Sequence, residues 1–418
     1  MTQRQIKLLL GNRPGAVGTL YFDATLGRYQ SSFEYSAEWL RSADRFALDP
    51  ALPLTSIRQY HTQVQGGSPF HGVFSDSGPD GWAMIVLARY AMVERGKFLL
   101  SEKTPLDLLL APADEFRIGA IRYQDEHGDI LGGGVAHSTD GMVLHLNDLL
   151  NASEAVECNQ QTAEQICHLL GAGTSLGGLR PKAAIRLETG SLAIAKFPSV
   201  NDTRPVPRGE ALALELARQA GITVPNFSIV DVLGRPVFLV DRFDRTTGGT
   251  RKHYASAITM LQSPGQTKGT YVAIAERIRQ IGSAPRADLH ELFRRMVLNV
   301  LISNSDDHLG NHGFLYNERG QWRLSPAFDL NPFPDTPCTL RTAISTKIGP
   351  VASIEACLSE ARAFDLKQDE ATNIVAKIGA TVSRWRQVAL SPVIGMTDRE
   401  ADLFAAAFEH SELNIARQ

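Results

Sequence analysis

The N-terminal part of the chain shows an alternation of apolar and polar positions. The run VGTLYFD leads to a turn at Gly27, after which Tyr29, Ser31, Phe33 and Tyr35 alternate with polar neighbours. A period of two residues is typical of a strand with one buried face. We therefore expect the first 60 or so residues to be β-rich, with one face of a hairpin packed on other elements.

Helical spacing follows between residues 80 and 110. The runs WAMIVLARYAMVERGKFLL and TPLDLLLA place apolar groups three and four residues apart, and the second run opens on a Thr-Pro helix start. With the strand-like FRIGAIRY, they predict a small α+β unit. Turn-forming residues without sustained periodicity between Gly132 and Cys158 predict irregular structure there, and with it the main domain boundary.

The following segment predicts strands around one helix. KAAIRLETGSLAIAKF reads as a hairpin that turns at Thr189-Gly190, and PVFLVDRF is a short apolar run suited to a buried strand. A helix is expected from Glu210 to Gly221. Beyond these strands the chain becomes mainly helical, and LHELFRRMVLNVLISN carries the apolar period of an amphipathic helix.

Composition narrows the class of protein without naming a function. The 418 residues are 43% hydrophobic and 21% charged, which is typical of a soluble globular protein and excludes disordered and fibrous classes. A net charge of -3 does not indicate a nucleic-acid surface. No signal peptide or long apolar stretch is evident, so we expect a cytoplasmic protein with no membrane association. Without a C-x-x-C pair, the cysteines are expected to be four buried, reduced thiols, namely Cys158, Cys167, Cys338 and Cys357.

Candidate chemistry lies directly after the long amphipathic helix. In SNSDDHLGNH, Asp306 stands five residues before Asn311, the offset at which a kinase loop places its catalytic Asp and a metal-binding Asn. Eighteen residues further on, SPAFDL is expected to close a strand with Asp329, a second carboxylate for Mg²⁺. Hard oxygen ligands of this kind suit phosphoryl transfer, which depends on positioning and charge neutralisation.

Two other interpretations of this segment remain open. In the first, the aspartates serve only as caps of turns, because Asp is a common turn residue. Alternatively, Asp307, His308 and His312 lie close enough in sequence for a zinc site, although the Glu of a metalloprotease helix is missing.

A glycine-rich stretch upstream, GAGTSLGGLRPK at 171–182, offers backbone N–H groups that would cradle phosphates. It matches neither a Walker loop nor G-x-G-x-x-G, and the alternative is a surface turn. Lys196 lies near the end of the strand-like LAIAKF, where either a phosphate would be its partner or its side chain reaches solvent. Glu210 and Glu215 are both candidate partners of Lys196.

Over nearly its whole length the sequence resembles the HipA family of Ser/Thr kinases, the toxins of bacterial type II toxin–antitoxin modules. The motifs that carry the resemblance are SDSGPDGW at 75–82, TSLGGLRPK at 174–182, IAKFP at 194–198, VDRFDR at 240–245, NSDDHLGN and AFDL. The resemblance implies an α+β protein with a two-lobed, protein-kinase-like fold, in which a β-rich lobe and a helical lobe follow a small N-terminal subdomain. We expect the subdomain at 1–135, the first lobe at 136–245 and the helical lobe at 246–418.

The same resemblance assigns roles to residues and implies ATP and Mg²⁺ as cofactors. It makes Asp306 the catalytic residue, Asn311 and Asp329 the magnesium ligands, and Ser175 a site of regulatory autophosphorylation. Added charge on Ser175 would repel the phosphates of ATP. The nucleotide-binding residues that it implies are Gly173, Thr174, Ser175, Leu176, Gly177, Gly178, Lys182, Lys196, Asp241, Arg242, Phe243, His308, Asn311 and Asp329.

The implied partners are a helix-turn-helix, HipB-like antitoxin, operator DNA reached through that antitoxin, and a protein substrate such as an aminoacyl-tRNA synthetase. The sequence departs from the family pattern at Asp241, at Arg180-Pro181 and in the additional carboxylate of Asp307. Two competing hypotheses follow: a small-molecule phosphotransferase of kinase-like fold, and a nucleotide-binding corepressor that acts on DNA with an antitoxin.

Overall fold

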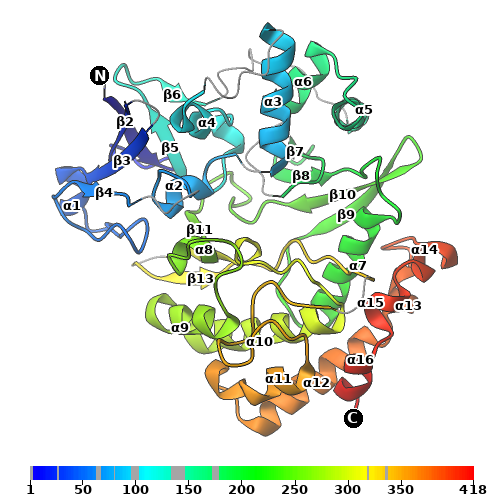
Figure 1. Cartoon of the computed structure of the whole chain (residues 1–418). Helices are drawn as coiled ribbons and strands as arrows, with labels where there is room; N and C mark the ends of the chain where they lie inside the picture. Colours follow the sequence, from blue (N-terminus) through cyan, green and yellow to red (C-terminus); the bar gives the residue numbers. More distant parts are fainter. Residues whose placement is uncertain are drawn as a thin grey trace. The chain divides into compact units, whose positions relative to one another are not determined.

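The computed structural model describes residues 3–25, 28–62, 67–79, 81–95, 103–132, 146–171, 178–317, 320–334 and 338–418. The chain forms two compact units (Figure 1). The first unit comprises residues 1–201, 232–235 and 241–255, and the second comprises residues 202–231, 236–240 and 256–418. The predicted three-part division at residues 135 and 245 is not tested by these units and stays a prediction.

The first unit contains an antiparallel sheet with the strand order β4-β3-β2-β1-β5-β6. Its strands are β1 (Arg4–Leu10), β2 (Gly18–Thr25), β3 (Arg28–Tyr35), β4 (Gln59–Tyr60), β5 (Ile121–Gln124) and β6 (Ile130–Leu131). The predicted hairpin is confirmed as β2 and β3, which pair with Leu20 opposite Phe33. Leu20, Phe33 and Tyr35 are buried, so one face of the hairpin belongs to the core.

The helices of the first unit include those predicted between residues 80 and 110 and others that the sequence did not predict. They are α1 (Ala37–Arg41), α2 (Gly72–Asp76), α3 (Gly81–Arg95), α4 (Pro105–Leu110), the 3-10 turn η2 (Asp114–Phe116), α5 (Leu146–Glu157) and α6 (Ala163–Gly171). Thr104 caps α4 through a reciprocal capping box with Asp107, as the Thr-Pro start indicates.

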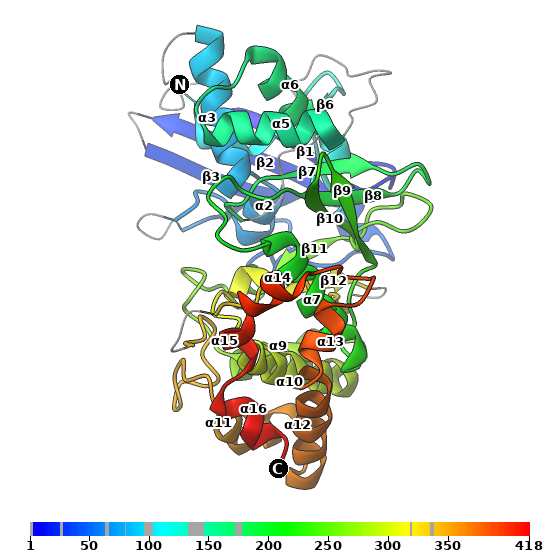
Figure 2. The same ribbon diagram turned by 90° about the vertical axis from the view of Figure 1, so that its right-hand side faces the viewer.

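Helix α5 forms in a segment for which the sequence predicted irregular structure. Its Asn, Ser and Asp residues are turn formers, but Leu149, Leu150 and Val156 are buried and stabilise the helix by packing. In both views α3, α5 and α6 lie side by side (Figures 1 and 2).

A second sheet has the strand order β7-β8-β10-β9. The strands are β7 (Lys182–Arg186), β8 (Leu192–Lys196), β9 (Phe227–Val232) and β10 (Arg235–Asp241), so both predicted strand regions are confirmed. Gly190 has a φ of 81° in the turn between β7 and β8, a conformation that glycine adopts without a steric penalty. A third sheet has the order β11-β12-β13, formed by β11 (Tyr254–Ser256), β12 (Gly313–Tyr316) and β13 (Trp322–Leu324).

Helices make up most of the second unit (Figure 2). They are α7 (Val206–Gln219), α8 (Ala257–Met260), α9 (Tyr271–Ile281), α10 (Pro285–Leu301), η3 (Leu309–Asn311), α11 (Ile354–Ser359), η4 (Ala361–Phe364), α12 (Gln368–Val382), α13 (Trp385–Ala389), α14 (Asp398–Asp402), α15 (Ala405–Phe408) and α16 (Ser411–Ala416). The predicted amphipathic helix is α10, whose apolar side chains are buried. Helix α7 begins four residues before the expected Glu210, because Pro205 and Pro207 suit a first turn.

Two other expectations are answered by the structure. All four cysteines are free thiols, but only Cys357 is buried and Cys158 is exposed, so burial was wrongly predicted for the set. Cys158 follows the last residue of α5, at a helix end that faces solvent. Within the described residues, no helix combines the length and the apolar character needed to cross a membrane.

Candidate active site

The long helix α10 ends where the candidate chemistry begins. Ser303 adopts a left-handed conformation with a φ of 51°, and the Asn304 N–H donates to the Asn299 carbonyl at 2.8 Å. The Ser303 N–H donates to the Val300 carbonyl at 3.2 Å. These bonds form a Schellman ending, with Ser where glycine is usual. The ending turns the chain sharply out of the buried helix and starts the segment that we call the 304–311 loop.

Short hydrogen bonds fix the 304–311 loop internally. The Asn311 side chain donates from Nδ2 to the Asp306 carbonyl at 2.9 Å, so the predicted metal ligand is tied to the predicted catalytic residue. His308 accepts a hydrogen bond on Nδ1 from the Gly310 N–H and caps η3. The His308 side chain therefore shapes the loop, and its predicted contact with a nucleotide stays a prediction.

Asp329 lies in the irregular segment after β13 and not at the end of a strand, which corrects the sequence-based expectation. Its φ of 56° is left-handed, a conformation that is uncommon outside glycine and is tolerated best by Asp and Asn. The Ala327 N–H donates to the Thr223 carbonyl at 2.8 Å and anchors this segment near α7. An unusual backbone angle that packing maintains is a feature of functional sites.

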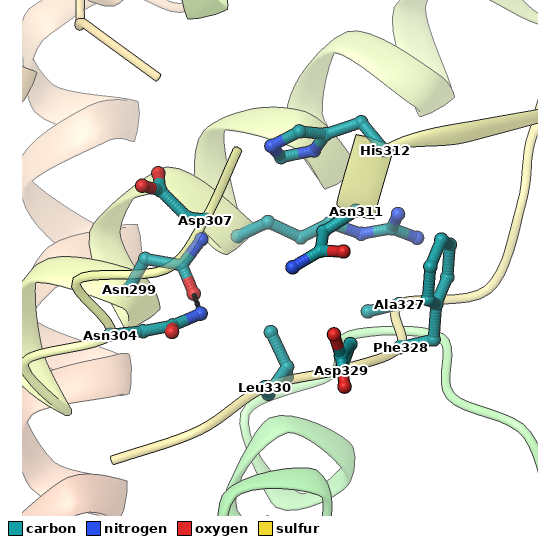
Figure 3. Close-up of a pocket in the computed structure, with 10 residues that line it drawn as sticks. Asn299, Asn304, Asp307, Asn311, His312, Ala327, Phe328, Asp329 and Leu330 are labelled. Atoms are coloured by element: carbon teal, nitrogen blue, oxygen red, sulfur yellow. Dashed lines mark hydrogen bonds between the residues drawn. The ribbon is translucent and has the colours of Figure 1, made fainter. Parts of the chain in front are cut away.

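A pocket in the second unit brings these segments together (Figure 3). Its lining residues are Arg295, Asn299, Asn304, Asp307, Asn311, His312, Ala327, Phe328, Asp329 and Leu330. Asn311 and Asp329 enter the pocket from different segments, so an amide oxygen and a carboxylate share one space. This donor set fits Mg²⁺, which prefers a few protein oxygens and takes its other ligands from water and phosphate.

Asp306 stands beside this pocket and is not one of its lining residues. Its carboxylate lies 3.1 Å from Nε of Arg341, and both side chains are partly exposed. An ion pair at this level of exposure is weak and exchangeable. Asp306 is therefore held at the partly exposed surface by a contact that solvent reaches.

Asp307 points into the protein interior, in contrast to Asp306. Tyr271 donates its hydroxyl to Oδ2 at 2.7 Å, and the N–H groups of Arg341 and Thr342 donate to Oδ1 at 2.8 and 3.3 Å. Burial raises the pKa of Asp307 to about 7, although these hydrogen bonds favour the ionised form.

The zinc interpretation is not supported by these contacts. Within the described residues, no group of three or more His, Cys, Asp or Glu side chains has an arrangement suited to a metal ion. Asp307 is engaged by Tyr271, and His308 by the Gly310 N–H.

His312 and Arg295 provide the buried wall of the pocket. His312 is 3% exposed, and neither of its ring nitrogens makes a hydrogen bond of normal geometry. Burial first, and then the nearby Arg295 guanidinium, lower the pKa of His312 to about 3, so the ring is neutral. Arg295 is paired with Glu291 at 2.8 Å and donates to the Ser325 carbonyl at 2.7 Å. The wall therefore contributes the dipole of the neutral His312 ring and the positive charge of Arg295, which is paired with Glu291.

The predicted phosphate-binding residues lie in the first unit. Gly173, Thr174, Ser175, Leu176 and Gly177 are outside the described residues. Gly178 accepts a hydrogen bond on its carbonyl from the Trp82 N–H at 2.7 Å, which joins the end of the glycine-rich stretch to the start of α3.

Lys182 and Lys196 are directly opposite each other in the register of β7 and β8. Opposed residues of an antiparallel pair project from the same face, where like charges repel each other unless anions lie nearby. A Cβ atom added at Gly178 would lie 2.7 Å from Nζ of Lys182, so this ammonium group packs against the glycine. The two predicted phosphate lysines and the end of the glycine-rich stretch are thus neighbours.

The predicted adenine-side residues have a structural setting of their own. Arg242 is buried, pairs with Asp244 at 2.6 Å and donates to the carbonyls of Phe116 and Arg117. The Arg242 backbone N–H donates to the Leu192 carbonyl. Arg242 of the VDRFDR motif is therefore tied to Phe116 and Arg117, and nucleotide contacts of Asp241, Arg242 and Phe243 stay a prediction.

The sequence left the partner of Lys196 open between two glutamates. Glu215 accepts hydrogen bonds from Arg218 at 2.6 Å and from Gln219 at 2.7 Å, one on each oxygen. Both of its carboxylate oxygens are therefore engaged within α7. Glu210 is also buried in α7, and its pairing with Lys196 stays a prediction.

Residues that sequence reasoning missed are Tyr271, Asn299, Asn304 and Arg341. Asn299 donates to the Tyr271 hydroxyl at 2.8 Å and accepts from Asn304 at 3.0 Å. The polar Asn299 among apolar residues of the α10 period was the available signal. Tyr271 and Arg341 lie 36 and 34 residues from Asp307, and no local pattern indicates such contacts.

Two family models match this chain. A family model described as the HipA-like C-terminal domain matches residues 174–385, and one described as the HipA N-terminal domain matches residues 12–124. The first match covers half of the chain. The chain therefore belongs to the HipA family.

Among solved structures, HipA of Shewanella oneidensis in its complex with HipB and operator DNA is similar to this chain. The TM-score is 0.67 at 18% identity, and the match covers 99% of this chain and 96% of that one. The likeness concerns the fold, which is the mixed α+β, protein-kinase-like fold expected from the sequence.

Curated relatives match over shorter segments. "Putative kinase Y4dM" of Sinorhizobium fredii is 34% identical over 156 residues, which are 34% of this chain and 37% of the relative. A "Putative kinase" of Haemophilus influenzae is 25% identical over 192 residues, which are 39% of this chain and 54% of the relative. The chain thus matches about a third to a half of the length of these two relatives.

Proposed function

We propose that this protein is a Mg²⁺- and ATP-dependent protein Ser/Thr kinase that acts as the growth-inhibiting toxin of a toxin–antitoxin pair. The observation that carries the proposal is the shared pocket of Asn311 and Asp329 beside Asp306. In phosphoryl transfer the protein contributes mainly positioning and charge neutralisation. One carboxylate for the acceptor hydroxyl and two oxygen ligands for Mg²⁺ meet this requirement.

The nucleotide side is supported by the register of Lys182 and Lys196. Two ammonium-bearing residues on one face, next to Gly178, favour the binding of a polyanion. Membership of the HipA family and relatives named as kinases support ATP as the donor. Ser175 is then a site of autophosphorylation, and a phosphate there would repel the phosphates of ATP.

The acceptor is proposed to be a protein, such as an aminoacyl-tRNA synthetase, and the partner a small HipB-like antitoxin with a helix-turn-helix. The antitoxin proposal is supported by the similar Shewanella HipA, whose structure includes HipB and operator DNA. Asp306 is half-exposed, as is required for a residue that must meet a large acceptor.

The test is phosphoryl transfer in a cell lysate with radiolabelled ATP and the purified chain. We expect labelled protein bands with the wild type and none with Asp306→Ala. Asp398→Asn, which changes a carboxylate in α14 far along the chain, serves as the control and should keep the bands. Label in small molecules only would refute the protein acceptor.

A corepressor role is the second candidate, favoured by the operator DNA in the Shewanella complex. It makes a different prediction, because repression of DNA with an antitoxin does not need the catalytic carboxylate. Intact repression by Asp306→Ala, together with a wild type that transfers no phosphate, would select this candidate and exclude the kinase.

A further inference from the structure

Asp307 accepts hydrogen bonds from two separate segments of the second unit. Tyr271 is the first residue of α9, and Arg341 and Thr342 belong to a segment that follows the Asp329 region. The Thr342 hydroxyl also donates to the Asp307 carbonyl at 2.6 Å. With 1% of its surface exposed, Asp307 is enclosed by these contacts. Its side chain therefore joins the 304–311 loop to both neighbours at once.

The side-chain hydrogen bonds from Asn304 to Asp307 all donate toward Asp307, so the Asp307 side chain has to be an acceptor. Asn304 donates to Asn299, Asn299 donates to the Tyr271 hydroxyl, and that hydroxyl donates to Asp307. Two backbone N–H groups donate to the other oxygen of Asp307. An ionised carboxylate accepts at both oxygens, whereas an amide of the same shape offers one acceptor and one donor group.

The same network reaches Asp306 from two sides. The Asp306 N–H donates to Oδ1 of Asn304 at 3.4 Å, and its carboxylate lies 3.1 Å from Arg341. Asn304 is the first donor in the series of hydrogen bonds that leads to Asp307. The backbone N–H of Arg341 donates to the Asp307 carboxylate. Both partners of the half-exposed Asp306 therefore belong to the same hydrogen-bond network as Asp307.

We propose that Asp307 is a positioning residue for phosphoryl transfer, which holds Asp306 in its working orientation by tying the 304–311 loop to Tyr271 and to residues 341–342. This inference rests on the proposed kinase function. In this proposal Asp307 acts through Tyr271, Arg341 and Thr342, and not through direct contact with the acceptor or the nucleotide. Catalytic geometry tolerates little displacement, so loss of this support lowers turnover more than nucleotide binding.

The experiment compares the full-length variants Asp307→Asn and Tyr271→Phe, their combination, and Asp288→Asn as a matched control. Asp288 is a buried carboxylate in the first turn of α10 that accepts from Arg323 and from the Leu324 N–H, away from the loop. The measured quantities are kcat and KM for Mg-ATP and the hydrogen exchange of the Arg341 and Thr342 amides.

For Asp307→Asn we expect kcat to fall about 10- to 100-fold while the KM for ATP changes less than about threefold. Tyr271→Phe should lower kcat about threefold or more, and the combined variant should be no slower than Asp307→Asn, because both changes break one network. Exchange at the Arg341 and Thr342 amides should accelerate in Asp307→Asn and not in Asp288→Asn.

A folded Asp307→Asn with a kcat within about twofold of the wild type, or multiplicative effects in the combination, would overturn the proposal. If Asp307→Asn does not fold, Tyr271→Phe decides by the same criterion. Absence of phosphoryl transfer in the wild type would refute the kinase function, and amide exchange would then still decide whether Asp307 ties the segments together.

Discussion

The Arg341 guanidinium lies 3.1 Å from the Asp306 carboxylate, and the two side chains are 53% and 38% exposed. The proposed catalytic residue is thus paired with a cation that solvent reaches. An acceptor hydroxyl that approaches Asp306 has to compete with Arg341 for the same carboxylate. Arg341 is therefore expected to control access of the acceptor and not the binding of ATP.

Replacement of Arg341 by Gln tests this competition. We expect the KM for the acceptor to fall by up to about fivefold, because an exposed ion pair contributes about 1 kcal/mol or less. The KM for ATP and the melting temperature should stay near the wild-type values. Arg386→Gln, which breaks another partly exposed pair with Asp402, is the control. A shifted KM for ATP with an unchanged acceptor KM would argue against the competition.

Loss of the Asn311 side chain tests the metal site. We expect Asn311→Ala to lower kcat at least about 100-fold and to raise the Mg²⁺ concentration needed for half-maximal rate, because one oxygen ligand is lost. Among the described residues, the side-chain amide of Asn317 in the β12–β13 hairpin donates to Ser283, so Asn317→Ala should leave the Mg²⁺ requirement unchanged. Equal Mg²⁺ requirements for wild type and Asn311→Ala would exclude Asn311 as a ligand.

The raised pKa of Asp307 predicts a pH dependence of folding stability. Its ordinary value is 3.8 and its folded value about 7, so the folded state holds this proton more tightly than the unfolded state. The contribution is present below pH 4 and is lost as the pH rises through 7, with a slope of about 1.4 kcal/mol per pH unit. Asp307→Asn removes this contribution.

Denaturant unfolding at several pH values between 4 and 8 measures the effect. We expect the free energy of unfolding of the wild type, relative to Asp307→Asn, to decrease as the pH rises across this window. Asp398→Asn changes a carboxylate in the first turn of α14 and should leave the wild-type dependence in place. Parallel curves for the wild type and Asp307→Asn would contradict the raised pKa.

How much of this site can be predicted from the sequence depends on how far apart along the chain the contacting residues lie. The period of α10 and the Asp306-Asn311 spacing are local, and both were predictable. The role of Asp307 was not, because its partners Tyr271 and Arg341 come from segments more than 30 residues away. The left-handed Asp329 likewise depends on packing around it and not on its neighbours in sequence.

Helix α5 shows the same limit in the fold. Its segment carries Asn, Asp and Ser residues that favour turns, yet burial of Leu149 and Leu150 stabilises it as a helix. Tertiary packing overrides local propensity in such cases. Hairpins were predicted more reliably, because strand period and turn residues are adjacent in sequence, as at Gly190.

Gly81 links the SDSGPDGW motif to the glycine-rich stretch. It has a φ of 38°, and an added Cβ would lie 2.1 Å from the Gly178 carbonyl oxygen, so Gly81→Ala must displace that carbonyl. We expect the KM for ATP to rise about three- to tenfold with a smaller change in kcat. Gly234→Ala, which has a φ of 77° and no atom within 4 Å of the added Cβ, provides backbone strain without a clash. Equal KM values for ATP in the two variants would show that Gly81 does not affect nucleotide binding.

The central claim is tested most directly by the mass of the purified protein after incubation with Mg-ATP. The account predicts that the wild type gains phosphate on Ser175, and that Asp306→Ala, Asn311→Ala and wild type with a chelator gain none. Asp398→Asn should behave as the wild type. An unmodified wild type that also transfers no phosphate to any protein in a lysate would contradict the assignment of Asp306, Asn311 and Asp329 as a kinase site.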